Sequence, residues 1–96
     1  MSGYTVSRQA RRDLKEIWTY IADDNRDAAN RLLANLEQKF QFLASQPYAG
    51  ERRPDLGDPE YRVFSAGNYV IFYRLRGRTV VVSHVRHGAR DWGKLP

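Results

Sequence analysis

The stretch YVIFYRLRGRTVVVSHVRHGARDW, residues 69–92, decides the fold that this sequence predicts. Its two runs of β-branched and aromatic residues predict strands over 69–75 and 79–86. Arg76-Gly77 between them is typical of a tight turn, so the two strands should form a hairpin. The second strand runs into a cluster of polar and charged side chains, which is a poor end for a simple core strand and therefore indicates a functional surface.

A third strand, over 61–64, precedes the hairpin and is joined to it by a turn at 65–68. Short turns between successive strands predict an antiparallel meander. Side chains alternate between the two faces of the sheet. One face carries Tyr69, Ile71, Tyr73 and Leu75, and the other carries Val70, Phe72 and Arg74. Because helices can cover only one face, the second face is predicted to be a docking surface, partly apolar and rich in arginine.

The N-terminal half shows the periodicity of helices. A short strand over 4–6 is followed by Ser7, a good helix N-cap, and then by an apolar stripe. The stripe consists of Ala10, Leu14, Ile17, Trp18 and Ile21. We expect Trp18 in the core, and Asp13 among the charged residues of the solvated face.

A second helix is predicted from 26 to 44, capped by Asp24 or Asn25 and stopped by Pro47. The short connection makes the two helices an antiparallel hairpin. Residues 46–59, rich in proline and glycine, are read as a loop. The element order is β-α-α-β-β-β, which predicts one α+β domain over 1–96 with an antiparallel sheet packed on the N-terminal helical hairpin.

The formal net charge is +5 and is unevenly distributed, with 7 basic and 6 acidic groups in 1–50 but 9 basic and 5 acidic groups in 51–96. Such a surface suits a nucleic acid or an acidic polypeptide, although a solvated basic surface is an equally good interpretation. The absence of cysteine excludes disulfides and thiolate metal sites. No apolar run has the length of a membrane span, so we expect a cytoplasmic protein with no membrane partner.

Several short motifs stand in a fixed order along the chain. They are Ala10-Arg11-Arg12-Asp13-Leu14-Lys15-Glu16-Ile17, Ala28-Ala29, Phe42-Leu43-Ala44, Tyr61-Arg62, Ile71-Phe72-Tyr73-Arg74 and Val85-Arg86-His87-Gly88-Ala89-Arg90-Asp91. In this order and spacing the chain resembles the RelE/ParE superfamily of bacterial toxins, and specifically its ParE branch. The resemblance covers nearly the whole chain.

The resemblance implies a toxin of a type II toxin–antitoxin system, neutralised by a ParD-like antitoxin and acting on DNA gyrase. It implies contact with operator DNA only through the antitoxin. RelE-type members instead cut mRNA on the ribosome, and this endoribonuclease activity is the alternative function. A basic DNA-binding module is a third interpretation, but the chain lacks a helix-turn-helix signature.

A nuclease of this kind needs proton transfer and positive charge at the phosphate. Glu60, Arg62, Arg74 and His87 are the candidates. RelE-type nucleases typically carry a C-terminal tyrosine near the phosphate, whereas here His87 precedes Gly88 and no tyrosine follows. We therefore predict a protein inhibitor with no catalytic residues, no cofactor and no metal. His84 and His87 lie three apart on a strand, so they should point to opposite faces.

An acidic amphipathic antitoxin tail would bind as a helix in a groove or as a strand added to a sheet edge. The predicted antitoxin-binding residues are Arg62, Phe72, Arg74, Arg86 and Trp92. The predicted target-binding residues are His87 and Arg90. Trp92 and the Arg90–Asp91 pair could equally serve to hold the tail of the chain.

Overall fold

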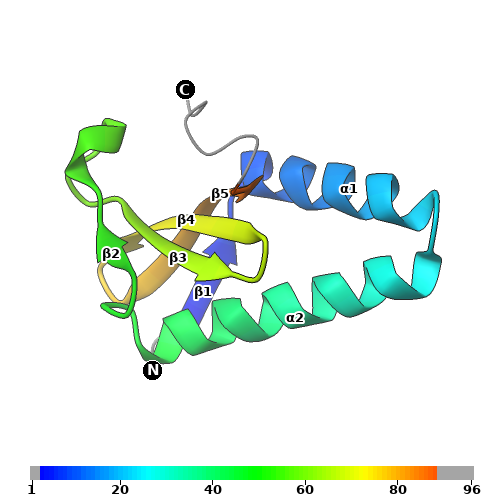
Figure 1. The fold of residues 1–96 in the computed structure, drawn as a ribbon. Helices are drawn as coiled ribbons and strands as arrows, with labels where there is room; N and C mark the ends of the chain where they lie inside the picture. Colours follow the sequence, from blue (N-terminus) through cyan, green and yellow to red (C-terminus); the bar gives the residue numbers. More distant parts are fainter. Residues whose placement is uncertain (1–2, 89–96) are drawn as a thin grey trace.

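The computed structural model of the protein describes residues 3–88. Two helices lie against one side of a five-stranded sheet (Figure 1). The elements are β1 (Gly3–Val6), α1 (Arg8–Ala22), α2 (Arg26–Ser45), β2 (Glu51–Arg52), the short 3-10 helix η1 (Pro54–Leu56), β3 (Arg62–Ala66), β4 (Tyr69–Arg76) and β5 (Thr79–His87). The predicted α+β architecture is confirmed.

The sheet is mixed, and not purely antiparallel as the sequence predicted. Its strand order is β1-β5-β4-β3-β2. Successive strands from β2 to β5 pair antiparallel, but β1 pairs parallel to β5. All elements from α1 to β4 lie between β1 and β5, which supplies the long connection that parallel strands need. The strand β2 lies within the predicted loop and pairs with β3 through only two residues.

Both helices begin at side-chain caps. The Ser7 hydroxyl accepts a hydrogen bond from the amide of Ala10 at 3.0 Å, and the Asn25 side chain accepts one from the amide of Ala28 at 2.9 Å. Each cap satisfies an amide that has no partner within its own helix. The prediction of Ser7 is confirmed, and Asn25 is the cap of the second helix.

The helical hairpin packs on the sheet face that carries Tyr69, Ile71, Tyr73 and Leu75, as the alternation predicted. Tyr73 is completely buried and ties down the chain that follows α2. Its hydroxyl donates to the carbonyl of Pro47 at 2.8 Å and accepts from the amide of Gly50 at 2.9 Å. Gly50 leaves the room for this contact, because any side chain there would collide with the Tyr73 hydroxyl.

Two residues of α1 lie in environments that the sequence analysis did not predict. Trp18 is half-buried at the surface of the hairpin, where its indole donates to the Asn30 side chain at 2.8 Å and the guanidinium of Arg26 lies 5.9 Å from the ring centre. Asp13, expected in solvent, is 3% exposed. Both differences follow from the way the hairpin sits on the sheet.

Candidate functional site

The first two turns of α1 replace a strand along the edge of β5. The strand β1 pairs with β5 only as far as Val82. Beyond that point the Ser7 amide donates to the carbonyl of Val82 at 2.9 Å, and the Ser7 hydroxyl donates to the carbonyl of Ser83 at 3.0 Å. The Asp13 carboxylate then accepts from the amide of Val85 at 3.0 Å. Helical side chains thus satisfy an edge that would otherwise leave buried backbone groups without partners.

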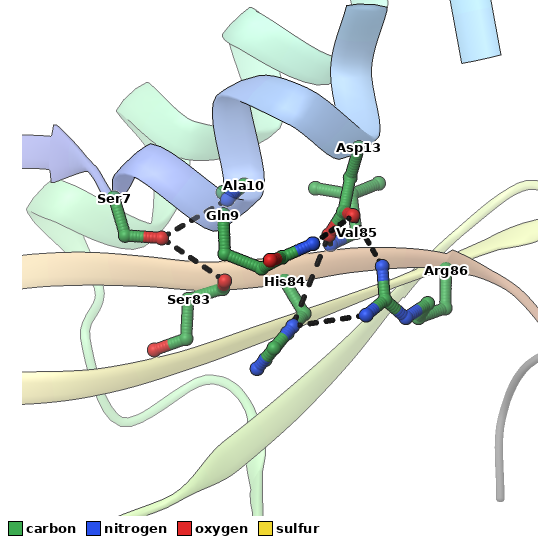
Figure 2. A network of polar contacts seen from close by, with 8 residues as sticks. All are labelled: Ser7, Gln9, Ala10, Asp13, Ser83, His84, Val85 and Arg86. Carbon is green, nitrogen blue, oxygen red and sulfur yellow. Dashed lines mark hydrogen bonds and ion pairs between the residues drawn. The ribbon is translucent and has the colours of Figure 1, made fainter. Parts of the chain in front are cut away.

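Asp13 is the centre of a buried polar cluster with Gln9, His84 and Arg86 (Figure 2). Gln9 donates to its carboxylate at 2.9 Å, and the Arg86 guanidinium forms an ion pair with it. The nearest nitrogen of His84 lies 3.9 Å away. The charge is therefore compensated by the Arg86 guanidinium and by hydrogen bonds from Gln9 and the Val85 amide, as a buried carboxylate requires.

His84 is the neutral member of this cluster. Burial lowers the pKa of His84 below its ordinary value, the nearby Arg86 charge lowers it further, and Asp13 opposes the shift. The Arg86 guanidinium lies 3.3 Å from the Nδ1 atom of His84. Because arginine has only donors, a hydrogen bond between the two side chains requires the His84 tautomer that carries its proton on Nε2. His84 is a hydrogen-bonded structural residue of this cluster.

His87 occupies the end of β5, on the opposite face from His84. The His84 ring lies against Phe72, 6.3 Å between ring centres, whereas the His87 ring lies edge-on to Tyr69 at 5.4 Å. The predicted divergence of the two histidines is confirmed. His87 also borders a pocket of about 150 Å³ between α1 and β5, together with Glu16 and Tyr20. Arg90, the second predicted target-binding residue, lies outside the described residues.

The three described arginines predicted to bind the antitoxin all have partners within the chain. Arg62 donates to the carbonyl of Gly50 at 2.9 Å, and its guanidinium lies 5.0 Å from the centre of the Tyr48 ring. Arg74 forms an ion pair with Asp58 at 3.0 Å, and Arg86 pairs with Asp13. These contacts hold the loop before β3 and the end of β5 in place.

The sheet face that was predicted to be a partly apolar docking surface also differs from the prediction. Phe72 is completely buried, so its side chain is not available as an exposed anchor. Trp92, the other predicted aromatic contact, lies outside the described residues. Sequence alternation assigned Phe72 to the correct face, but alternation carries no information about what lies over that face.

The residues that a nuclease would need do not form one site. Glu60 is exposed in the loop before β3, and its amide donates to the Asp58 carboxylate at 2.8 Å. That carboxylate also holds Arg74, and the pKa of Asp58 is lowered by these two hydrogen bonds, that of Glu60 first. Glu60 and Arg74 are therefore joined through Asp58, at the end of the sheet where β3 begins.

His87 lies at the other end of the sheet. It pairs with Tyr69, whereas Arg62 pairs with Tyr73 on the same strand. At about 3.3 Å per residue, this separates the two side chains by roughly 13 Å along β4 alone. The set of Glu60, Arg62, Arg74 and His87, named for the case of a nuclease, is thus divided between two regions of the sheet.

An apolar groove on the helical hairpin is the feature that sequence analysis missed. It has a volume of about 380 Å³ between α1 and α2, and its lining includes Leu14, Trp18, Leu33 and Phe40. A second hollow, of about 470 Å³, continues toward β1 and shares Leu14 and Phe40 with the first. The apolar stripe of α1 is wider than the face that the sheet covers, since Leu14 and Trp18 line the groove. This width was the signal in the sequence that could have indicated a groove.

Some classes of site are absent from the part of the chain that the structure describes. Within residues 3–88 no three His, Cys, Asp or Glu side chains gather as a metal site would require. None of the helices in that range is both long and apolar enough to cross a membrane.

The fold and these surfaces define a small α+β protein, and comparison with known proteins gives its family. A family model described as the ParE toxin of the type II toxin–antitoxin system parDE matches residues 4–92. Toxin ParE1 of Mycobacterium tuberculosis is 36% identical over 92 residues, covering 94% of this chain and 93% of that protein. The chain belongs to the ParE toxin family of type II toxin–antitoxin systems.

Two further comparisons agree with this assignment. Toxin ParE1 of Caulobacter vibrioides is 32% identical over 87 residues, covering 85% of each chain. A solved structure of the chromosomal ParDE toxin–antitoxin system from P. aeruginosa superposes with a TM-score of 0.74 at 18% identity, covering 91% of this chain and 96% of that one. The structural likeness concerns the fold alone. Membership of the ParE family, shown by the family model, implies an antitoxin partner.

Proposed function

We propose that this ParE-type toxin acts by inhibiting DNA gyrase and is neutralised by a cognate ParD-like antitoxin. The observation that carries the proposal is the match of the ParE family model across residues 4–92, because ParE-type toxins are associated with gyrase inhibition. The division of the candidate nuclease residues between two ends of the sheet also favours an inhibitor over a catalyst.

Controlled expression of the toxin in a bacterial host tests this function. We expect a shift of plasmid topoisomers toward the relaxed form, together with arrested division, while primer extension on abundant transcripts detects no new cleavage. Co-expression of the antitoxin should restore both supercoiling and growth. Cleaved transcripts with normally supercoiled plasmids would instead assign the RelE-type endoribonuclease activity.

The antitoxin is proposed to bind as a helix in the groove between α1 and α2. A groove with an apolar floor and charged residues at its rim has the form that amphipathic helices occupy. Leu33 is half-buried and borders the groove without belonging to the fully buried core. The arginines of β3 and β4, by contrast, have partners within the chain.

Leu33→Asp places a charge in the groove and should weaken antitoxin binding in calorimetry by about a hundredfold, as expected for a contact in the desolvated centre of an interface. Leu56→Asp, at a half-buried leucine of the loop far from the groove, is the matched control. Equal affinities of Leu33→Asp and the wild type would refute the groove as the antitoxin site.

A further inference from the structure

The two walls of the groove are built by the same helical spacing. On α1 the wall consists of Arg11, Leu14, Lys15 and Trp18, and on α2 it consists of Leu33, Leu36, Glu37 and Phe40. Each set follows the i, i+3, i+4, i+7 pattern of one helix face. The two faces enclose an apolar floor, and each wall adds charged residues above it.

The charges on the two walls are of opposite sign. The wall of α1 carries Arg11 and Lys15, whereas the wall of α2 carries Glu37. Glu37 borders both hollows and therefore stands where they join. Within residues 3–88 none of these three side chains makes an ion pair or a hydrogen bond, and all three are exposed.

These three charges are significant for their place, because they stand beside an apolar floor that a bound partner would cover. A partner that fills the groove must meet these charges with groups of opposite sign, since like charges in contact repel each other and reject wrong partners. The groove therefore selects both the composition of a bound partner and its orientation.

We propose that the groove is polarised for an antitoxin helix with a basic residue on one flank and acidic residues on the other. The basic residue faces Glu37 on α2, and the acidic residues face Arg11 and Lys15 on α1. This arrangement fixes the rotation of the helix about its own axis. Glu37 is the specificity-determining residue because it is the acidic group at the junction of the two hollows. The inference rests on the proposed binding of an antitoxin in this groove.

Calorimetry with the full-length antitoxin encoded beside this toxin tests the inference. Glu37→Lys and Lys15→Glu should each weaken binding about tenfold or more, because each creates a like-charge contact. Asp24→Lys makes the same change in net charge as Glu37→Lys, but in the exposed turn between the helices, and should bind within about twofold of the wild type. Circular dichroism of each variant confirms that the fold is retained.

A compensating exchange in the antitoxin gives the most specific result. Replacing its basic residue by glutamate should restore the affinity of Glu37→Lys and weaken that of the wild-type toxin. If Glu37→Lys and Lys15→Glu both bind the antitoxin with wild-type affinity, the proposed charge polarity of the groove is overturned, while the proposed function remains intact. Failure of the wild-type toxin to bind at all would overturn the antitoxin proposal itself, and the polarity with it.

The groove could also accept a second copy of this chain, since its two walls carry complementary charges. Sedimentation of the toxin alone distinguishes this occupant. We expect a monomer at micromolar concentration for the wild type and for Glu37→Lys. A dimer that Glu37→Lys dissociates would assign the groove to self-association and overturn the inference.

Discussion

Asp13 shows how one side chain joins two elements that are far apart in sequence. It lies on the second turn of α1 and accepts a hydrogen bond from the backbone of β5 while pairing with Arg86. Removing one partner of a buried ion pair leaves an uncompensated charge, which costs more than the pair itself contributes. The attachment of α1 to the end of β5 therefore depends on this carboxylate.

Asp13→Asn should destabilise the fold by about 3 kcal/mol, because the amide keeps the shape of the side chain but leaves Arg86 without a counter-charge. Urea denaturation measures the effect. Glu16→Gln, one turn along α1 at an exposed position, should change stability by less than about 0.5 kcal/mol. Similar losses in the two variants would show that the buried pair has no special role.

His84 gives the fold a pH dependence near neutrality. Its pKa is lowered in the folded protein from an ordinary value of 6.5, so the unfolded chain binds the proton more tightly. Stability should therefore fall as the pH decreases through about 6.5 toward the folded pKa. Denaturation midpoints between about pH 8 and pH 5 test this, and His84→Gln should show the shallower dependence. An identical pH dependence of the denaturation midpoint in His84→Gln and the wild type would contradict this role of His84.

The burial of Asp13 could have been predicted from the sequence. Ala10, Asp13 and Ile17 share the i, i+3, i+7 spacing of the apolar face, so a charged residue there is either misplaced or buried with a partner. The identity of that partner could not be predicted, because Arg86 belongs to a strand at the far end of the chain. Burial depends on packing between elements, which local patterns do not encode.

At the scale of elements, local chemistry predicted most of what is observed. The helix caps, the end of α2 near Pro47 and the alternation along β4 arise from neighbouring residues and were recovered. The parallel pairing of β1 and the two-residue strand β2 were not, because both depend on where distant segments meet. The groove was missed for the related reason that the width of the sheet decides how much of the hairpin it covers.

The loop after α2 depends on a single hydroxyl of the sheet. Tyr73→Phe removes the donor to Pro47 and leaves the Gly50 amide without its acceptor, which should destabilise the fold by about 1–3 kcal/mol. Thermal denaturation measures this change. Tyr48→Phe, in the same loop at a side chain that is 72% exposed, is the matched control and should be nearly neutral. Equal thermal stability of the two variants would contradict a structural role of the Tyr73 hydroxyl.

At the scale of the whole molecule, α1 borders two different surfaces, the groove on its α2 side and the pocket on its β5 side. The groove between α1 and α2 is proposed for the antitoxin, and the end of β5 with His87 is proposed for the target. Neutralisation then does not require the antitoxin to cover the target surface directly. Separate surfaces predict that single substitutions can affect one activity without the other.

His87→Ala should reduce the inhibition of gyrase by about tenfold, in the range of a single important contact, while antitoxin affinity stays within about twofold. Arg78→Ala, at the exposed turn where β5 begins, is the control and should alter neither. The readouts are supercoiling by purified gyrase and calorimetry with the antitoxin. A parallel loss of both activities would indicate that His87 supports the fold and does not contact the target.

The central claim, that this toxin inhibits gyrase without catalysis of its own, is tested most directly by one paired assay. Purified toxin is titrated into a gyrase supercoiling reaction and, in parallel, into a ribosome-dependent mRNA cleavage reaction, each with and without antitoxin. The account predicts lost supercoiling or trapped cleaved DNA, intact mRNA, and reversal by the antitoxin. Cut mRNA with normal supercoiling would contradict it and move the function to the ribosome.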